Sequence, residues 1–177
     1  MPIIETQTNE TATGKVRRIY DEILARGLPF VPKPVQVMSA SPELMRRYWH
    51  MLSWVLDHPR ISRKALAHIR LGVALVSYYP YCVELNTQAL QQMMEMNREQ
   101  LAAFRENPAQ SLLPENEREL VSFVVRSIRE PEETTAEDVQ RLRDQGWSDA
   151  DVFDATFMGA FMLTSGVLFT TFKMNDA

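Results

Sequence analysis

The residue with the clearest chemical potential in this sequence is its single cysteine, Cys82, which follows the run Tyr78-Tyr79-Pro80-Tyr81. Proline fits best in the first turn of a helix, where its missing N–H costs little, so Pro80 predicts a helix start just before Cys82. A thiol in that turn lies near unpaired amides and the positive end of the helix dipole, which stabilise a thiolate and lower the thiol pKa. The pattern therefore makes Cys82 a candidate nucleophile.

A second interpretation of Cys82 is structural. Free cysteine is among the residue types most often buried. The segment before the tyrosines is a predicted helix that Ser62 can cap. Its apolar residues recur at spacings of three and four and face a core: Leu66, Ile69, Val73 and Val76. On this interpretation Cys82 is one more small apolar side chain, and the tyrosines pack beside Pro80.

The segment ALAHIRLGVALVSYYPYCVELNTQAL resembles the alkylhydroperoxidase D-like and carboxymuconolactone decarboxylase family. The peroxidase branch of that family carries a glutamate, then a Cys-x-x-Cys pair, then a histidine one helical turn further on. By this resemblance Cys82 stands at the second cysteine and Tyr79 at the first. Asn86 stands at the histidine and Ala67 at the glutamate, so only the cysteine at position 82 is kept.

The rest of the frame is similar to the family as well. The segments that carry the similarity are Val31-Pro32-Lys33, the helix start Ser41-Pro42-Glu43-Leu44 and the stretch Gly146-Trp147-Ser148-Asp149. The resemblance implies an all-α, AhpD-like helical bundle. It also implies a single oligomeric domain over residues 1–177, with a helical N-terminal arm at about residues 14–40.

The activity that the resemblance implies is that of an antioxidant-type peroxidase with peroxiredoxin activity, and Cys82 is its attacking thiol. Because the chain has one cysteine, an external thiol must complete the reaction. Tyr79 can donate a hydrogen bond to a peroxide. Asn86 cannot relay protons at neutral pH. His68, beside the lost glutamate, is the remaining candidate for proton transfer.

Alternatives stay open at each of these positions. His68 can be a surface or interface histidine, and Tyr79 can serve aromatic packing alone. The whole protein can be a carboxymuconolactone decarboxylase-type enzyme, in which case Cys82→Ala keeps its activity. It can also be a non-catalytic helical oligomer that binds a small ligand in the pocket left behind.

Helical patterns account for the rest of the chain. Those before residue 61 predict a helix over residues 14–26, an extended proline-rich connector over 28–35, and a helix from Pro42 to about Asp57 whose inner face includes Leu44. Later helix starts follow from capping patterns: Asn97 with Gln100, Thr135 with Asp138, and Ser148 with Asp151.

The last helical pattern, VFDATFMGAFMLTSGVLFTTFKM, is apolar for nearly the length of a membrane span. Its five serines and threonines, and its lack of aromatic belts with basic flanks, argue against a span. A helix that is apolar on all sides is equally typical of a core shared between subunits. We therefore expect a homo-oligomer, from dimer to hexamer, that has no contact with a membrane.

Composition excludes several classes of function. The chain has 177 residues and a formal net charge of -4, which argues against nucleic-acid binding. A single cysteine cannot form an internal disulfide, and the N-terminus has no pattern of a secretory signal, so we expect a cytoplasmic protein. The three histidines lack ligand spacing, and we expect neither a metal nor a cofactor. The expected partner, besides further copies, is a small-molecule substrate or ligand.

Overall fold

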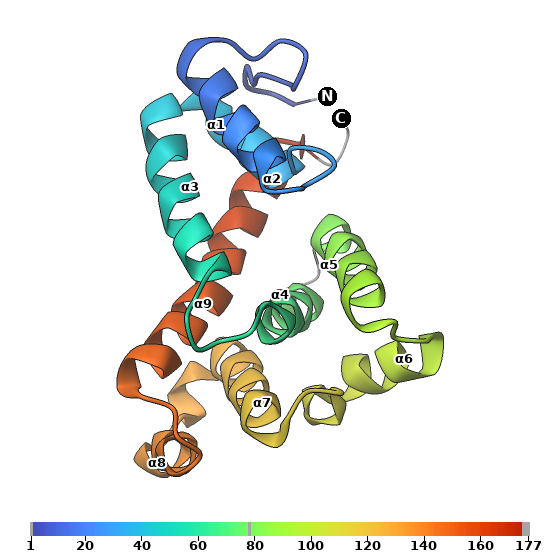
Figure 1. Ribbon diagram of the computed structural model, residues 1–177, viewed down its shortest axis with the longest axis vertical. Helices are drawn as coiled ribbons and strands as arrows, with labels where there is room; N and C mark the ends of the chain where they lie inside the picture. The colour runs from blue at the N-terminus through green and yellow to red at the C-terminus, as the bar shows by residue number, and fades with distance from the viewer. Residues whose placement is uncertain (1, 78, 175–177) are drawn as a thin grey trace. The chain divides into compact units, whose positions relative to one another are not determined.

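The computed structural model describes residues 2–77 and 79–174, and every regular element within them is a helix (Figure 1). This confirms the all-α prediction. The helices are α1 (Gly14–Ala25), α2 (Lys33–Val37), α3 (Pro42–Leu56), α4 (Arg63–Ser77), α5 (Pro80–Met94), α6 (Arg98–Glu106), α7 (Glu115–Arg129), α8 (Ala136–Asp144) and α9 (Asp149–Thr171). Three short 3-10 turns join them: η1 (Met38–Ala40), η2 (Pro108–Gln110) and η3 (Pro131–Glu133).

The chain divides into two compact units, residues 1–54 with 165–177 and residues 55–164. The first unit packs α1, α2 and the beginning of α3 around a small core centred on Tyr20 and Met45, both fully buried. The polar ends of its aromatic residues are satisfied. The Tyr20 hydroxyl donates to the Gln7 carbonyl at 2.6 Å, and Trp49 Nε1 donates to Glu22 Oε2 at 3.1 Å. The expected single domain over residues 1–177 stays a prediction.

Two expectations for the first unit are wrong. The proline-rich connector is not extended throughout, because Lys33–Val37 forms α2, with Pro32 at its N-cap and a proline in its first turn. In α3, Leu44 is 53% exposed, whereas Met45 and Trp49 are buried. Val55, at the other end of the predicted inner face, is buried as expected, so the error lies at the start of α3.

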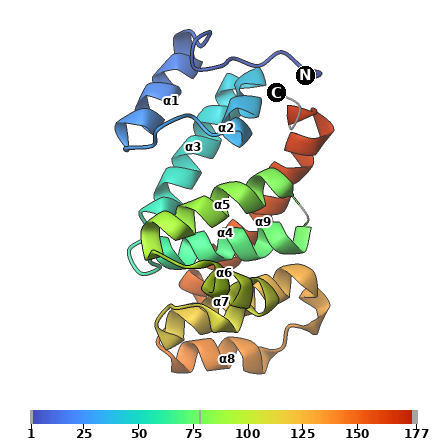
Figure 2. The ribbon, with the colours of Figure 1, turned by 90° about the vertical axis from the view of Figure 1, so that its right-hand side faces the viewer.

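The second unit is built on an antiparallel hairpin of α4 and α5, which lie side by side in Figure 2. α4 is buried from Ala65 to Ala74 apart from Arg70. Glycine permits close helix approach on both sides of α7. A Cβ at Gly72 would come within 2.4 Å of Val125 Cγ2, and one at Gly159 within 2.7 Å of Val124 Cγ1.

The predicted helix caps are confirmed. Ser62 Oγ accepts from the Ala65 amide at 3.0 Å. Asn97 with Gln100 and Thr135 with Asp138 form complete capping boxes, and Ser148 and Asp151 exchange the same pair of bonds at the start of α9.

α9 is the one helix in the described part of the chain that is long and apolar enough to cross a membrane. Its most apolar window has a mean hydropathy of 1.6, and 39% of that window is buried. Length and composition alone do not distinguish a span from a core helix.

Candidate functional site

Cys82 is the third residue of α5, in the turn that Pro80 opens, as the sequence predicts. Two backbone hydrogen bonds hold Tyr79 between α4 and α5. The Tyr79 amide donates to the Ala74 carbonyl at 3.3 Å, and the Val83 amide donates to the Tyr79 carbonyl at 2.9 Å. The Cys82 side chain is buried, with 3% of the residue exposed. The structural interpretation of Cys82 is therefore correct as to its burial.

The expected lowering of the thiol pKa is wrong. Burial raises the pKa of Cys82 above its ordinary value. The cause is desolvation, because removal from water disfavours the charged thiolate. At neutral pH Cys82 is therefore a thiol, which is the less nucleophilic form.

Asn86 lies one turn after Cys82 on α5 and is buried. Both ends of its side-chain amide are engaged. Nδ2 donates to the Cys82 carbonyl at 2.7 Å, and Oδ1 accepts from Arg70 Nε at 3.1 Å. Asn86 therefore ties the two helices of the hairpin together directly beside the thiol. It has no titratable proton with which to replace a histidine.

His68 is fully buried in α4, so its interpretation as a surface or interface histidine is wrong. Nδ1 lies 2.8 Å from the Lys64 carbonyl and the ring meets Phe104 edge-on, with centroids 4.9 Å apart. Nδ1 therefore carries the proton, and Nε2 is left without a partner among the described residues. Burial lowers the pKa of His68, against smaller opposing contributions from the Lys64 carbonyl and the Glu117 carboxylate.

His68 and Cys82 are not brought together. α4 and α5 run antiparallel, and Arg70 meets Asn86 across them. His68 lies further from the hairpin turn than Arg70, so its level on α5 is beyond Asn86, away from Cys82. No hydrogen bond joins His68 to the thiol within the described residues.

The other two positions of the family pattern are occupied by residues with structural roles. Tyr79 is the N-cap of α5, with φ -98° and ψ 94°, and its side chain makes no capping bond. It is half-buried at the level of the turn. Ala67 is fully buried and contributes a methyl group to the core, with no base in its place. Tyr78 lies outside the described residues.

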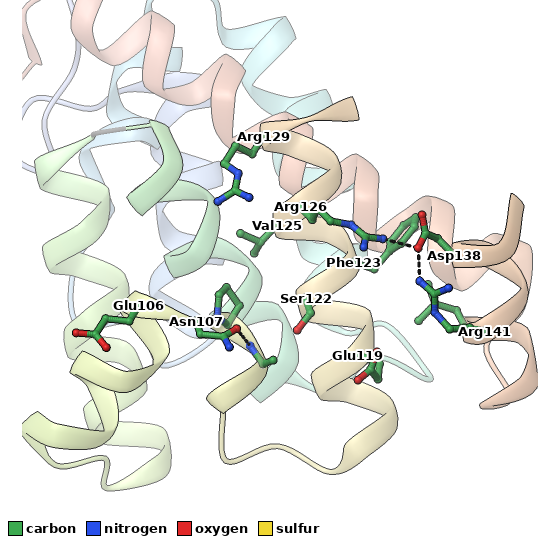
Figure 3. A pocket seen from close by; sticks show the side chains of 13 residues that line it. Glu106, Asn107, Glu119, Ser122, Phe123, Val125, Arg126, Arg129, Asp138 and Arg141 are labelled. Atoms are coloured by element: carbon green, nitrogen blue, oxygen red, sulfur yellow. Dashed lines mark hydrogen bonds and ion pairs between the residues drawn. The ribbon is translucent and has the colours of Figure 1, made fainter. Parts of the chain in front are cut away.

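A cavity of about 370 Å³ lies at the surface of the second unit (Figure 3), and its lining does not include Cys82. α7 forms its floor, and α6, η2 and α8 form its sides. Asp138 is the most constrained group at its rim. The Thr135 amide donates to its carboxylate at 2.9 Å, Arg126 pairs with it at 2.7 Å, and Arg141 is a third partner. These bonds hold the pKa of Asp138 far below its usual range.

A polar network of the second unit joins the start of α4 to the start of α9. His58 Nδ1 accepts from the amides of Arg60 at 3.2 Å and Ile61 at 3.0 Å, so Nε2 carries the proton that faces Asp154 Oδ2 at 3.4 Å. Arg60 Nε donates to Asp151 Oδ2 at 2.8 Å, and the Arg60 guanidinium lies over the Trp147 ring. No group of three His, Cys, Asp or Glu side chains that could hold a metal ion occurs among the described residues.

Two residues of the region were not anticipated from the sequence. Arg70 is the only charged residue between Ala65 and Val76, and a lone charge within a buried helix is a signal that points to a specific partner. Glu117, on α7, is buried and accepts from the Ser62 amide at 3.1 Å, so it stabilises the start of α4. Its sequence gives no such signal, because acids are common in the first turn of any helix.

Comparison with solved structures identifies the fold. An uncharacterised peroxidase-related protein from Silicibacter sp. TM1040 matches with a TM-score of 0.75 and 20% identity, covering 97% of this chain and 87% of that one. The alkylhydroperoxidase AhpD core of an uncharacterised peroxidase-related protein from Ralstonia eutropha JMP134 matches with a TM-score of 0.77 and 19% identity, covering 98% and 90%. No protein-family model and no curated protein matches the sequence. The fold is that of the alkylhydroperoxidase D core, as the resemblance implied.

Proposed function

We propose that this protein is a slow hydroperoxide reductase that works through one thiol, Cys82. The observation that carries the proposal is the position of the only cysteine in the chain: the first turn of α5, in a fold whose solved neighbours are named peroxidase-related. Attack on the O–O bond converts the Cys82 thiolate to a sulfenic acid and releases an alcohol, once the alkoxide has taken a proton.

An external thiol then completes the cycle. It condenses with the sulfenic acid to a mixed disulfide and water, and a second external thiol releases Cys82 as a thiol and leaves as the disulfide. The chain's own residues supply placement, because Asn86 and Arg70 hold the first turn of α5 against α4. The proton leaves Cys82 to water, since Asn86 and Ala67 offer no base.

The low rate follows from two properties of the thiol. An unshifted thiol with a pKa of about 8.5 is roughly 3% ionised at pH 7, and burial reduces that fraction further for Cys82. Access requires opening of the first turn of α5, which begins with the exposed Pro80. Short helix ends open at low free-energy cost compared with a core.

The test is consumption of cumene hydroperoxide with dithiothreitol as electron donor. The wild-type rate should rise roughly tenfold per pH unit between pH 7 and 9, following the thiolate fraction. Cys82→Ala should remove the catalysed rate, and a dimedone adduct at Cys82 should accumulate when the reductant is left out. A rate that Cys82→Ala leaves intact would overturn the proposal.

A second candidate function, ligand binding without turnover, is favoured by the burial of Cys82 and by the loss of its family partners. The 370 Å³ cavity at α7 is large enough for a small molecule. Its lining combines charged side chains with apolar ones such as Phe123, Val125 and Leu142, so it suits a small ligand that has both polar and apolar groups. Unchanged Cys82 after millimolar hydroperoxide, measured by mass spectrometry, would leave this candidate in place of the first.

A further inference from the structure

The cavity over α7 carries a surplus of positive charge on its α8 side (Figure 3). Arg126 from α7 and Arg141 from α8 both reach Oδ1 of Asp138, Arg126 at 2.7 Å. The other carboxylate oxygen, Oδ2, accepts from the Thr135 amide at 2.9 Å and from the Thr135 hydroxyl at 3.1 Å. Both oxygens of Asp138 are therefore occupied, and its one negative charge serves two guanidinium groups.

The two arginines keep donors for a further anion. Each guanidinium carries five N–H groups, and Asp138 is the partner of both, with no other among the described residues. The side chains of Arg126 and Arg141 are 41% and 58% exposed, whereas that of Asp138 is 7% exposed. A guanidinium matches the geometry of a carboxylate. This side of the cavity therefore suits one more carboxylate, which neutralises the surplus charge.

Apolar side chains lie next to the two arginines in the lining. Phe123 is one turn before Arg126 on α7, and Leu142 is one turn after Asp138 on α8. The volume of about 370 Å³ is at the small end of the usual range for ligand pockets, about 300–1,000 Å³. The fitting ligand is thus a small acid with a hydrocarbon body.

The other charged groups of the lining limit the charge of the ligand. Arg129 is paired with Glu130 at 3.0 Å. Glu119 is two turns before Arg126, about 10 Å along the axis of α7, and Glu106 ends α6 on the opposite wall (Figure 3). These two acids have no partner among the described residues, and both repel a second negative charge. A monocarboxylate is therefore favoured over a dicarboxylate.

We propose that this cavity binds a small organic monocarboxylate. Its carboxylate lies between Arg126 and Arg141, and its hydrocarbon part covers Phe123 and Leu142. This assignment gives the ligand class of the second candidate function, on which it rests. It does not depend on Cys82, which is absent from the lining.

Isothermal titration calorimetry with hexanoate tests the ligand class on the wild-type protein. Hexanoate should bind with a dissociation constant of roughly 1 mM, as expected of a ligand with so few atoms. Hexanol, hexylamine and inorganic phosphate each lack either the acid group or the hydrocarbon, and should bind at least roughly tenfold more weakly. Adipate, which adds a second carboxylate, should also bind more weakly than hexanoate. No hexanoate binding, or an equal affinity for any of the other four, would overturn the proposal.

Substitutions locate the site, with circular dichroism to check each fold. Arg126→Gln and Arg141→Gln should each weaken hexanoate binding roughly tenfold or more, because each removes one of the two guanidiniums. Arg143→Gln is the matched control on α8, since Arg143 pairs with Asp149 and is not in the lining, and should leave the affinity unchanged. Glu119→Gln should tighten binding roughly twofold by removing a like charge about 10 Å away in water.

The outcomes separate this site from the chemistry at Cys82. Full affinity in both arginine variants would place hexanoate elsewhere and contradict the proposal. If Arg126→Gln does not fold, Arg126→Lys keeps the charge beside Asp138 and should still weaken binding, because lysine lacks the planar fork. Cys82→Ala should bind hexanoate as the wild type does, so a failed peroxidase test leaves this proposal standing. Binding of hexylamine in place of hexanoate would keep the cavity as a ligand site but refute the carboxylate.

Discussion

The polar groups around His58 and those around Cys82 lie in the same compact unit, but they make different kinds of hydrogen bond. At the α4–α9 junction, two helix starts and a connecting loop leave many backbone amides without helical partners, and the side chains of His58 and Asp151 accept from them. Arg60 in turn donates to the Asp151 carboxylate. At the hairpin, one amide side chain, Asn86, joins two helices beside a buried thiol. The comparison teaches that the capping of helix starts is enough to gather a dense cluster of titratable residues, whereas the hairpin places a single amide side chain beside its thiol.

The junction should contribute more stability than the hairpin. Asp151→Ala removes a buried cap of α9 and the partner of Arg60, and should lower the free energy of unfolding by about 2–3 kcal/mol. Asp149→Ala is the matched control, because it removes an exposed ion pair in the same turn and should lower the free energy of unfolding by much less than Asp151→Ala does. Urea unfolding followed by circular dichroism measures both. Equal losses would remove the distinction between the two regions.

At the hairpin, Asn86→Ala should cost about 1–2 kcal/mol, since it removes two hydrogen bonds from a buried position. The same urea experiment measures it. Gln88→Ala, which removes an exposed bond to Glu84 on the same helix, should be nearly neutral. A loss larger than that of Asp151→Ala would reverse the comparison.

His68 should make the protein sensitive to mild acid. Because burial lowers its pKa in the folded state, its contribution to stability is present above the unfolded pKa of about 6.5 and is lost as the pH falls through the folded value. The slope is at most about 1.4 kcal/mol per pH unit. His68→Leu should flatten the stability profile below pH 6.5, and His50→Gln, at an exposed position, should not. An unchanged slope in His68→Leu would contradict the assignment.

Of these residues, Cys82 should have the smallest effect on the free energy of unfolding, and only at alkaline pH. Its folded pKa is raised, so its contribution is present below the unfolded value of about 8.5 and is lost as the pH rises through the folded value. Cys82→Ala should therefore show a flatter decline in stability between pH 8.5 and 10 than the wild type does. Parallel curves would mean that the thiol titrates alike in both states.

The sequence predicted what local chemistry decides. The helix caps were predictable because each capping bond joins a side chain to a backbone amide three residues further on. The capping residues are Ser62, Asn97, Thr135 and Ser148. Pro80 opens α5 for the same local reason. The fold class follows from these starts together with the helical periods between them.

What the sequence did not predict depends on contacts between distant segments. The pKa of Cys82 depends on how completely the rest of the unit removes it from water. His68 is buried because α6 brings Phe104 against its ring. The pairing of Arg70 with Asn86 required the register of the hairpin, which neither helix specifies alone.

Gly72 allows α4 to pack closely against α7, and this close contact restricts how far α4 can shift along α7. Val125 occupies the space that any Cβ there would need, so a shift of either helix by a fraction of a turn would set backbone against methyl groups. Arg70 is two residues before Gly72 on α4. The position of α4 against α7 therefore also affects the hydrogen bond from Arg70 to Asn86. A larger residue at position 72 would therefore displace α4 relative to α5 and disturb the hydrogen bonds of Asn86 beside Cys82, without contacting those polar groups itself.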